Sequence, residues 1–163
     1  MYKDILINIL LLFFLTIIQV TIIELIAINQ IKPDLVLIAL IYITLREGQI
    51  PGIIYSFFAG VILDILGNGI IGSNSFSKVI VMFVVGYFHD PFSITSFRID
   101  LRFPLIVLIS AIVDRILYIF ITLSLDFNEL INLMIGYGIL PAIFTAITSL
   151  LTLIFTKRGA IST

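Results

Sequence analysis

Several ionisable side chains stand inside the long apolar runs of this sequence, where they could bind a ligand, contact a partner or pair with one another. Charged groups at membrane depth are costly, so residues of this kind are functional candidates by default. The candidates are Glu24, Asp34, Asp64, Lys78, Asp114 and Arg115. Together they indicate either a polar pocket or partner-docking patch, or a set of structural pairs inside the protein.

The structural interpretation predicts specific contacts. We expect Asp64 to pair with Lys78, and Asp34 to cap the first turn of its helix, where a negative charge is favourable. Asp114 and Arg115 point about 100° apart on a helix, so they find different partners or share one polar seam through the flexible Arg115. This pair could fix how its helix docks, or it could contact a partner helix or a substrate.

Other reactive chemistry is missing from the sequence. There is no cysteine, which excludes disulfides, thiolate metal sites and thiol catalysis. His89 is the only histidine, so a histidine-based metal site is excluded and a cap at the membrane interface is expected. Nucleotide-binding loops, zinc-protease motifs and serine-hydrolase motifs are absent as well. We therefore expect no enzymatic activity, no cofactor and no metal. The net charge of -1 gives no electrostatic reason to expect nucleic-acid binding.

The composition is that of a membrane protein. Hydrophobic residues make up 61% of the 163 residues and charged residues 12%, about half the charged share of a soluble domain. The mean hydropathy is +1.26. We predict an all-α integral membrane protein in which residues 1–163 form one domain with six transmembrane helices. The predicted spans are 4–28, 33–45, 50–66, 75–89, 103–125 and 130–156.

Spans two to four are short. Each has fewer apolar residues than the roughly 20 that a lone spanning helix needs, which neighbouring helices or a thinner bilayer can accommodate. A re-entrant hairpin made of spans two and three is the alternative. Pro33 and Pro51 are expected in the first turns of spans two and three, and Pro141 is expected to kink span six.

The distribution of lysine and arginine predicts the orientation. One set of turns and ends holds Lys3, Arg46, Arg98, Arg102, Lys157 and Arg158, whereas the opposite side holds Lys32 and, near a span end, Lys78. Both termini are therefore expected in the cytoplasm. The first apolar run is too long for a signal peptide, so we expect it to be retained as a span. In this orientation Glu24, Asp34, Asp64 and Lys78 lie in the outer halves of their spans.

Residues 51–88 form the hairpin that we expect the other spans to pack around. Three small residues and one carboxylate recur every four positions and so line one helix face: Gly52, Ser56, Gly60 and Asp64. Small residues allow another backbone to approach closely in lipid, so we expect this face to receive a partner's helix, with Asp64 fixing the register. Gly67 and Gly72 belong to the turn that follows.

Two runs, KPDLVLIALIYITLREG and GIIYSFFAGVILDILGNGIIGSNSF, together with VGYF at the end of span four, resemble the bacterial rod shape-determining protein MreD family. The resemblance covers roughly residues 30–90, and the chain length, the six spans and the cytoplasmic termini also fit. Its features are a short span opening with Pro-Asp, a span with a Gly-x-x-x-Asp core and a glycine turn. Here these are Pro33-Asp34, Gly60 with Asp64, and Gly67 with Gly72.

The resemblance implies a non-enzymatic scaffold of the cell-elongation machinery in the bacterial cytoplasmic membrane, surrounded by lipid. Its implied direct partner is MreC, a single-span protein. The wider assembly includes MreB, RodA and a class B penicillin-binding transpeptidase, and the complex could pair with a second copy. The family is also similar in fold to the substrate-binding S-components of energy-coupling-factor vitamin transporters. The alternative function is therefore solute binding, in a pocket lined by Glu24, Asp34, Asp64 and Lys78.

Overall fold

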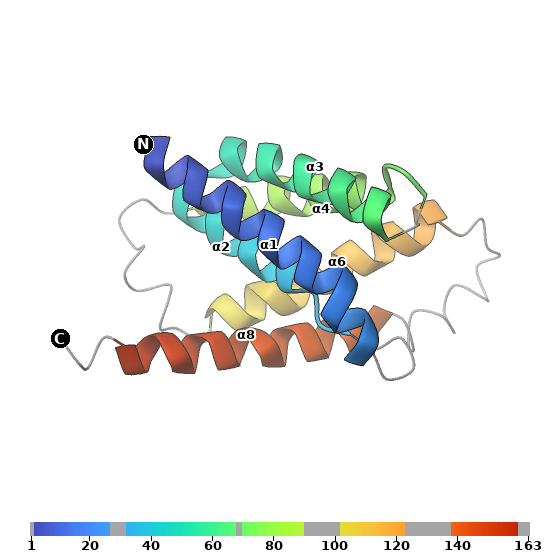
Figure 1. Cartoon of the computed structure of the whole chain (residues 1–163). Helices are drawn as coiled ribbons and strands as arrows, with labels where there is room; N and C mark the ends of the chain where they lie inside the picture. Colours follow the sequence, from blue (N-terminus) through green and yellow to red (C-terminus); the bar gives the residue numbers. More distant parts are fainter. Residues whose placement is uncertain (1, 27–31, 68–69, 90–101, 123–137, 160–163) are drawn as a thin grey trace.

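The computed structural model describes residues 2–26, 32–67, 70–89, 102–122 and 138–159, which form a bundle of α-helices (Figure 1). A 3₁₀ turn, η1 (Gly86–Phe88), extends the fourth helix. The helices are α1 (Tyr2–Ile26), α2 (Leu35–Glu47), α3 (Gln49–Leu66), α4 (Ser73–Val85), α6 (Arg102–Thr122) and α8 (Leu140–Gly159). The prediction of an all-α protein is confirmed for the described residues.

The helix bounds differ from the predicted spans by a few residues. α2 begins at Leu35 rather than at Pro33, because Asp34 is its N-cap. Pro51 lies in the first turn of α3, as predicted. Pro141 lies in the first turn of α8. The predicted kink there also concerns residues 130–137, which lie outside the described part of the chain, as does the loop 90–101 with Arg98.

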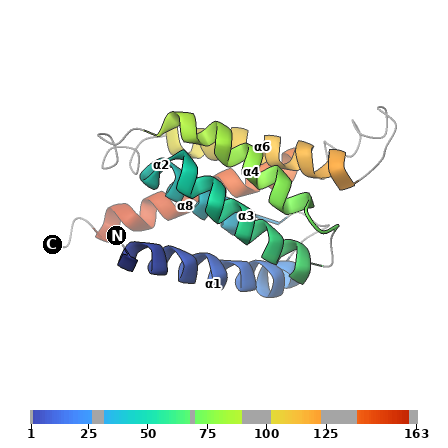
Figure 2. The same ribbon diagram turned by 90° about the horizontal axis from the view of Figure 1, so that it is seen from above.

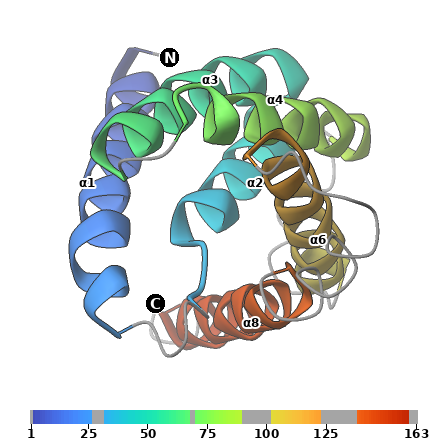
Figure 3. The same ribbon diagram turned by 90° about the vertical axis from the view of Figure 1, so that its right-hand side faces the viewer.

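The short helix α2 is the centre of the bundle (Figure 3). It contacts α1, α3, α4, α6 and α8. Its sequence, LVLIALIYITLRE, is apolar on every side until its last turn, which is the pattern of a fully enclosed helix. The prediction that the other spans pack around the hairpin 51–88 is therefore wrong. The hairpin is one wall of the bundle, and the span before it is the core.

The remaining helices surround α2 in chain order. α3 and α4 share the most extensive contact in the bundle, α4 also packs against α6, and α6 packs against α8. On the other side α1 packs against α2 and α3. Figure 3 shows this arrangement end-on, with α1 on the left, α3 and α4 along the top, α6 on the right and α8 at the bottom.

The helix lengths suit a membrane. Among the described residues, three helical segments are long and apolar enough to cross one: Lys3–Ile22, Gln49–Leu66 and Arg102–Thr122. Because α3 is among them, a re-entrant hairpin of α2 and α3 is not favoured. α2, with 13 residues, spans only about 20 Å, less than the ~30 Å hydrocarbon core, and its neighbours shield it.

The start of α1 and the end of α8 lie at the same end of the bundle (Figure 1). An even number of crossings has this result. The assignment of that end to the cytoplasm, and the number of six crossings, stay predictions from the sequence.

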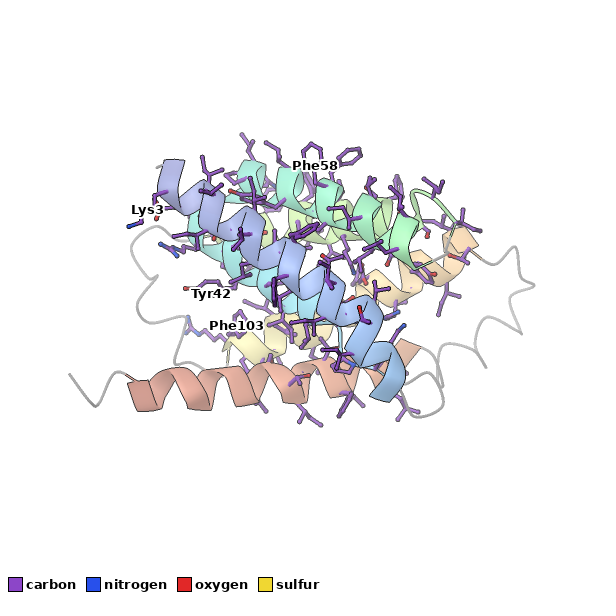
Figure 4. All side chains as sticks on the ribbon, viewed as in Figure 1. Lys3, Tyr42, Phe58 and Phe103 are labelled. Atoms are coloured by element: carbon purple, nitrogen blue, oxygen red, sulfur yellow. The ribbon has the colours of Figure 1, made fainter. Side chains whose placement is uncertain are left out.

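Large apolar side chains cover the outside of the bundle (Figure 4). Phe58 on α3 is 61% exposed and points away from the other helices, whereas Phe103 on α6 is buried. Exposed apolar surface on this scale would drive association in water. Lipid is the environment in which these side chains are stable.

Candidate functional site

The start of α2 is held by a carboxylate. Asp34 is the N-cap of the helix, in extended backbone geometry, and its Oδ1 accepts a hydrogen bond from Leu37 N at 2.8 Å. This bond satisfies one of the amide groups that a helix leaves unpaired at its beginning. The predicted cap is confirmed. The same carboxylate is buried, with only 5% of the residue exposed, so its charge requires compensation inside the protein.

That compensation comes from two neighbouring helices. Lys78 Nζ on α4 lies 2.8 Å from Asp34 Oδ2 and 3.2 Å from Asp114 Oδ2 on α6. Arg115 Nη2 lies 3.8 Å from Asp34 Oδ2. Ser77 Oγ donates a 2.9 Å hydrogen bond to Asp114 Oδ1. Two carboxylates therefore face two cations, and the cluster is formally neutral.

The backbone before α2 is fixed by two further helices. Gln19 on α1 donates from Nε2 to Pro33 O at 2.9 Å and accepts at Oε1 from Leu35 N at 3.0 Å. Thr145 Oγ1 on α8 accepts a 3.0 Å hydrogen bond from Asp34 N. Side chains from α1, α4, α6 and α8 thus converge on residues 33–35. We call this group of contacts the α2 junction: Gln19, Asp34, Ser77, Lys78, Asp114, Arg115 and Thr145.

A second buried carboxylate organises the turn between α3 and α4. Oδ2 of Asp64 accepts from Gly72 N at 2.9 Å and Ser75 N at 3.3 Å. Its Oδ1 accepts from Asn74 N at 3.0 Å, and from the side chains of Asn74 and Ser73. Asp64 therefore caps the helix that follows its own, where the aligned amide groups favour an anion.

The small residues of α3 bring this chain's own helices together. A Cβ atom at Gly60 would overlap Ser75 Cα on α4, and one at Gly52 would overlap the side chain of Thr44 on α2. Ser56 is fully buried and donates to Ile53 O within its own helix. The close approach predicted for this face is present, but it is made to α2 and α4. The expected partner helix has no room at these positions.

One known protein family matches this chain over nearly its whole length. The family model described as rod shape-determining protein MreD matches residues 3–158. The chain belongs to the MreD family. Comparison with the curated proteins and with the solved structures gave no significant match. The resemblance seen in residues 30–90 is thereby confirmed and extended over nearly the whole chain, and it associates this MreD-family chain with the determination of rod shape.

Of the two arrangements expected for the charged residues of this MreD-family chain, one is absent and one is present. The predicted Asp64–Lys78 pair is wrong, because the carboxylate of Asp64 accepts its hydrogen bonds from the start of α4. Lys78 lies one turn further on and faces Asp34 and Asp114. Asp114 and Arg115 do reach different partners within one polar seam, as one of the two interpretations predicted. The side chain of Glu24 lies outside the described part of the chain.

Sequence reasoning missed three members of the α2 junction. Gln19 carried a signal, since it is an amide inside the apolar run FFLTIIQVTII. Ser77 and Thr145 carried none, because hydroxyl residues in apolar helices ordinarily bond to their own backbone. Thr145 does so as well, donating to Pro141 O while it accepts from Asp34 N.

Gly67, Gly72 and His89 act locally. Gly67 N donates to Leu63 O at the end of α3, and Gly72 has a φ of +100°, a left-handed conformation that favours glycine. His89 Nδ1 lies 2.7 Å from Leu45 O, near the end of α2. Carbonyls in the last turn of a helix lack a partner within it, so the histidine caps the end of α2. The position of this cap at the membrane interface stays a prediction.

The charged groups of the α2 junction stabilise the packing of the helices. Its cations and carboxylates are engaged with one another, and Lys78 is fully buried. Breaking a buried ion pair leaves an uncompensated charge, so the arrangement strongly disfavours any other placement of the five helices it joins.

Proposed function

We propose that this chain is a non-enzymatic scaffold of the rod-shape machinery in the bacterial cytoplasmic membrane. It binds an MreC-like single-span protein and, through that protein, helps to direct peptidoglycan synthesis. The single observation that carries the proposal is the α2 junction: charged residues of three helices serve to lock a bundle together. Such a bundle is a rigid body that can present fixed surfaces to other membrane helices.

The partner's helix packs on the lipid-facing surface. The small-residue face of α3 is filled by Thr44 and Ser75 of the same chain, so it is not available. The outer surface offers large apolar side chains on each of the helices that surround α2, including Phe58, Phe83 and Ile109. MreB, RodA, a class B penicillin-binding transpeptidase and a second copy of the complex join through this partner or beside it.

The contacts of the charged residues favour a scaffold over a vitamin-binding subunit. A solute pocket was expected at Glu24, Asp34, Asp64 and Lys78. Asp34 and Lys78 pair with each other, and Asp64 accepts hydrogen bonds from the start of α4. A solute would have to displace these internal partners.

Co-purification tests the proposal. The full chain, tagged and co-expressed with the MreC-like protein of the same organism, is expected to retain that protein through detergent extraction. A photo-crosslinker placed singly at Phe58, Phe83 or Ile109 should locate the contact on α3, α4 or α6. A folded chain that neither retains nor crosslinks the MreC-like protein contradicts the proposal. A vitamin that stabilises the purified chain reproducibly would replace it with the transporter alternative.

A further inference from the structure

A groove of about 1000 Å³ lies between α1 and α3, with the last turn of α2 at one end. The two helices run in the same direction, with their N-terminal ends on the same side (Figure 2). None of the charged residues of the α2 junction lines the groove. Its walls are mostly apolar and include Ile9, Phe13, Ile54 and Phe58. Its polar end is formed by Asp4, Arg46 and Glu47.

The polarity of the groove is strongly one-sided. Its charged residues gather where α1 and α3 begin and α2 ends. The polar side chain furthest from that end on α1 is Thr16, whose hydroxyl donates to Leu12 O in its own helix. The deep part of the groove therefore offers apolar walls, and its mouth offers one guanidinium and two carboxylates. A ligand with a charged head and apolar tails matches this order.

The depth of the groove matches one leaflet of a bilayer. From Asp4 to Thr16 along α1, and from Ile50 to Ile62 along α3, the walls extend for about 18 Å at 1.5 Å per residue. Half of the hydrocarbon core is about 15 Å thick. A transmembrane helix would need a groove about twice as long, whereas the acyl chains of a lipid in one leaflet need a groove of this length.

The charges at the mouth select the headgroup. The guanidinium of Arg46 can donate two parallel hydrogen bonds to a phosphate. Asn8 Nδ2 donates to Glu47 Oε1, which holds that carboxylate in place at the mouth. An ammonium group is the partner that carboxylates prefer, and a primary ammonium can donate hydrogen bonds, which a quaternary one cannot. An anionic headgroup would bring no ammonium to pair with the Glu47 carboxylate.

We propose that the α1–α3 groove binds a phosphatidylethanolamine lipid, with its acyl chains along the apolar walls, its phosphate at Arg46 and its ammonium at Glu47. In the orientation predicted from the basic residues, this lipid belongs to the inner leaflet. The proposal rests on the groove and not on the scaffold function. A partner helix that packs at Phe58, which lines the groove, would take the place of the lipid.

Native mass spectrometry of the full chain, released from nanodiscs of defined composition, tests the proposal. Phosphatidylethanolamine, phosphatidylglycerol and phosphatidylcholine are titrated separately. We expect one phosphatidylethanolamine to be retained at least fivefold more strongly than either of the others, the factor that an ion pair of about 1 kcal/mol provides. Equal retention of the three lipids, or a preference for phosphatidylglycerol, overturns the proposal.

Two variants separate the groove from the rest of the surface. Ile54→Trp fills the groove and should reduce retention at least fivefold. Ile109→Trp, at a similarly exposed position on α6 outside the groove, should leave it unchanged. Glu47→Gln keeps an oxygen for Asn8 but removes the charge, so the preference for phosphatidylethanolamine should disappear while acyl-chain binding persists. Retention that is the same in wild type and Ile54→Trp, or a photo-crosslink from position 54 to a partner helix instead of lipid, overturns the proposal.

Discussion

Asp34 and Asp64 are both buried carboxylates that accept hydrogen bonds from the start of a helix, yet the protein compensates their charges in different ways. Asp34 caps its own helix and faces two cations, Lys78 and Arg115. Asp64 caps the next helix and is surrounded by amide and hydroxyl donors. One charge is balanced by opposite charges from other helices, and the other by the dipoles of a helix beginning a few residues later.

The difference determines how far each carboxylate acts. The donors to Asp64 all belong to residues 72–75, so it stabilises a single turn and the contact between α3 and α4. The partners of Asp34 come from α4, α6 and α8, at sequence separations of up to 111 residues. The first kind of compensation is local, while the second joins the bundle together.

The largest effect is expected from Lys78→Met, because it leaves Asp34 and Asp114 facing each other without the buried cation between them. We expect the free energy of unfolding in mixed micelles, followed by circular dichroism, to fall by about 3–5 kcal/mol. Lys3→Met, at an exposed position, is the control and should have little effect. Adding Asp114→Asn to Lys78→Met should recover part of the loss. A loss under about 1 kcal/mol would mean that the cluster does not hold the helices.

The second prediction compares the two carboxylates directly through double-mutant cycles. Asp34→Asn combined with Lys78→Met should show a coupling of about 2 kcal/mol, because these side chains share a 2.8 Å ion pair. Asp64→Asn combined with Lys78→Met should be additive within about 0.5 kcal/mol, since no contact joins them. The same unfolding measurement serves for both cycles. Equal couplings would remove the distinction between local and long-range compensation.

The third prediction concerns the contact that Asp64 supports. Gly60→Ala places a methyl group against the backbone of Ser75, so α3 and α4 must separate, at a cost of about 1–3 kcal/mol. Gly72→Ala is the matched variant, since nothing lies within 4 Å of its added methyl group and only the left-handed backbone opposes it. It should cost about 1 kcal/mol. If the two losses are reversed, backbone strain rather than helix contact dominates the hairpin.

The smallest effect is expected at the attachment of α8. Thr145→Val removes one neutral hydrogen bond to Asp34 N and leaves the shape nearly unchanged, so the unfolding free energy should fall by about 1 kcal/mol. Thr148→Val is the control, because its hydroxyl bonds only to carbonyls of its own helix. Equal losses for the two variants would show that Thr145 contributes no more than an ordinary hydroxyl.

The sequence predicted features that depend on neighbouring residues. Helix positions followed from apolar runs and breaks, and the role of Asp34 followed from its place before such a run. The partners of Lys78 did not follow, because they lie 44 and 36 residues away and depend on which helices meet. Asp64 was the nearer carboxylate along the chain, and proximity in sequence was the wrong guide.

The central position of α2 was missed for a related reason. Small residues every four positions in α3 indicated close helix packing, which is present. They could not indicate which helix packs there. The apolar character of α2 on all sides was visible in the sequence, but in a membrane protein a helix of that kind can face lipid as well as protein.

The enclosure of α2 also bears on how the chain is made. Ribosomes deliver α1 and α2 to the membrane well before the segments that contain Lys78, Asp114 and Thr145. Until those segments are inserted, the carboxylate at the start of α2 has no cation beside it. During this time α2, with 13 residues, is shorter than the hydrocarbon core of the bilayer and lacks the helices that later enclose it. Completion of the core therefore depends on segments made after α2, and a chain truncated before α4 would leave the carboxylate of Asp34 without its cations.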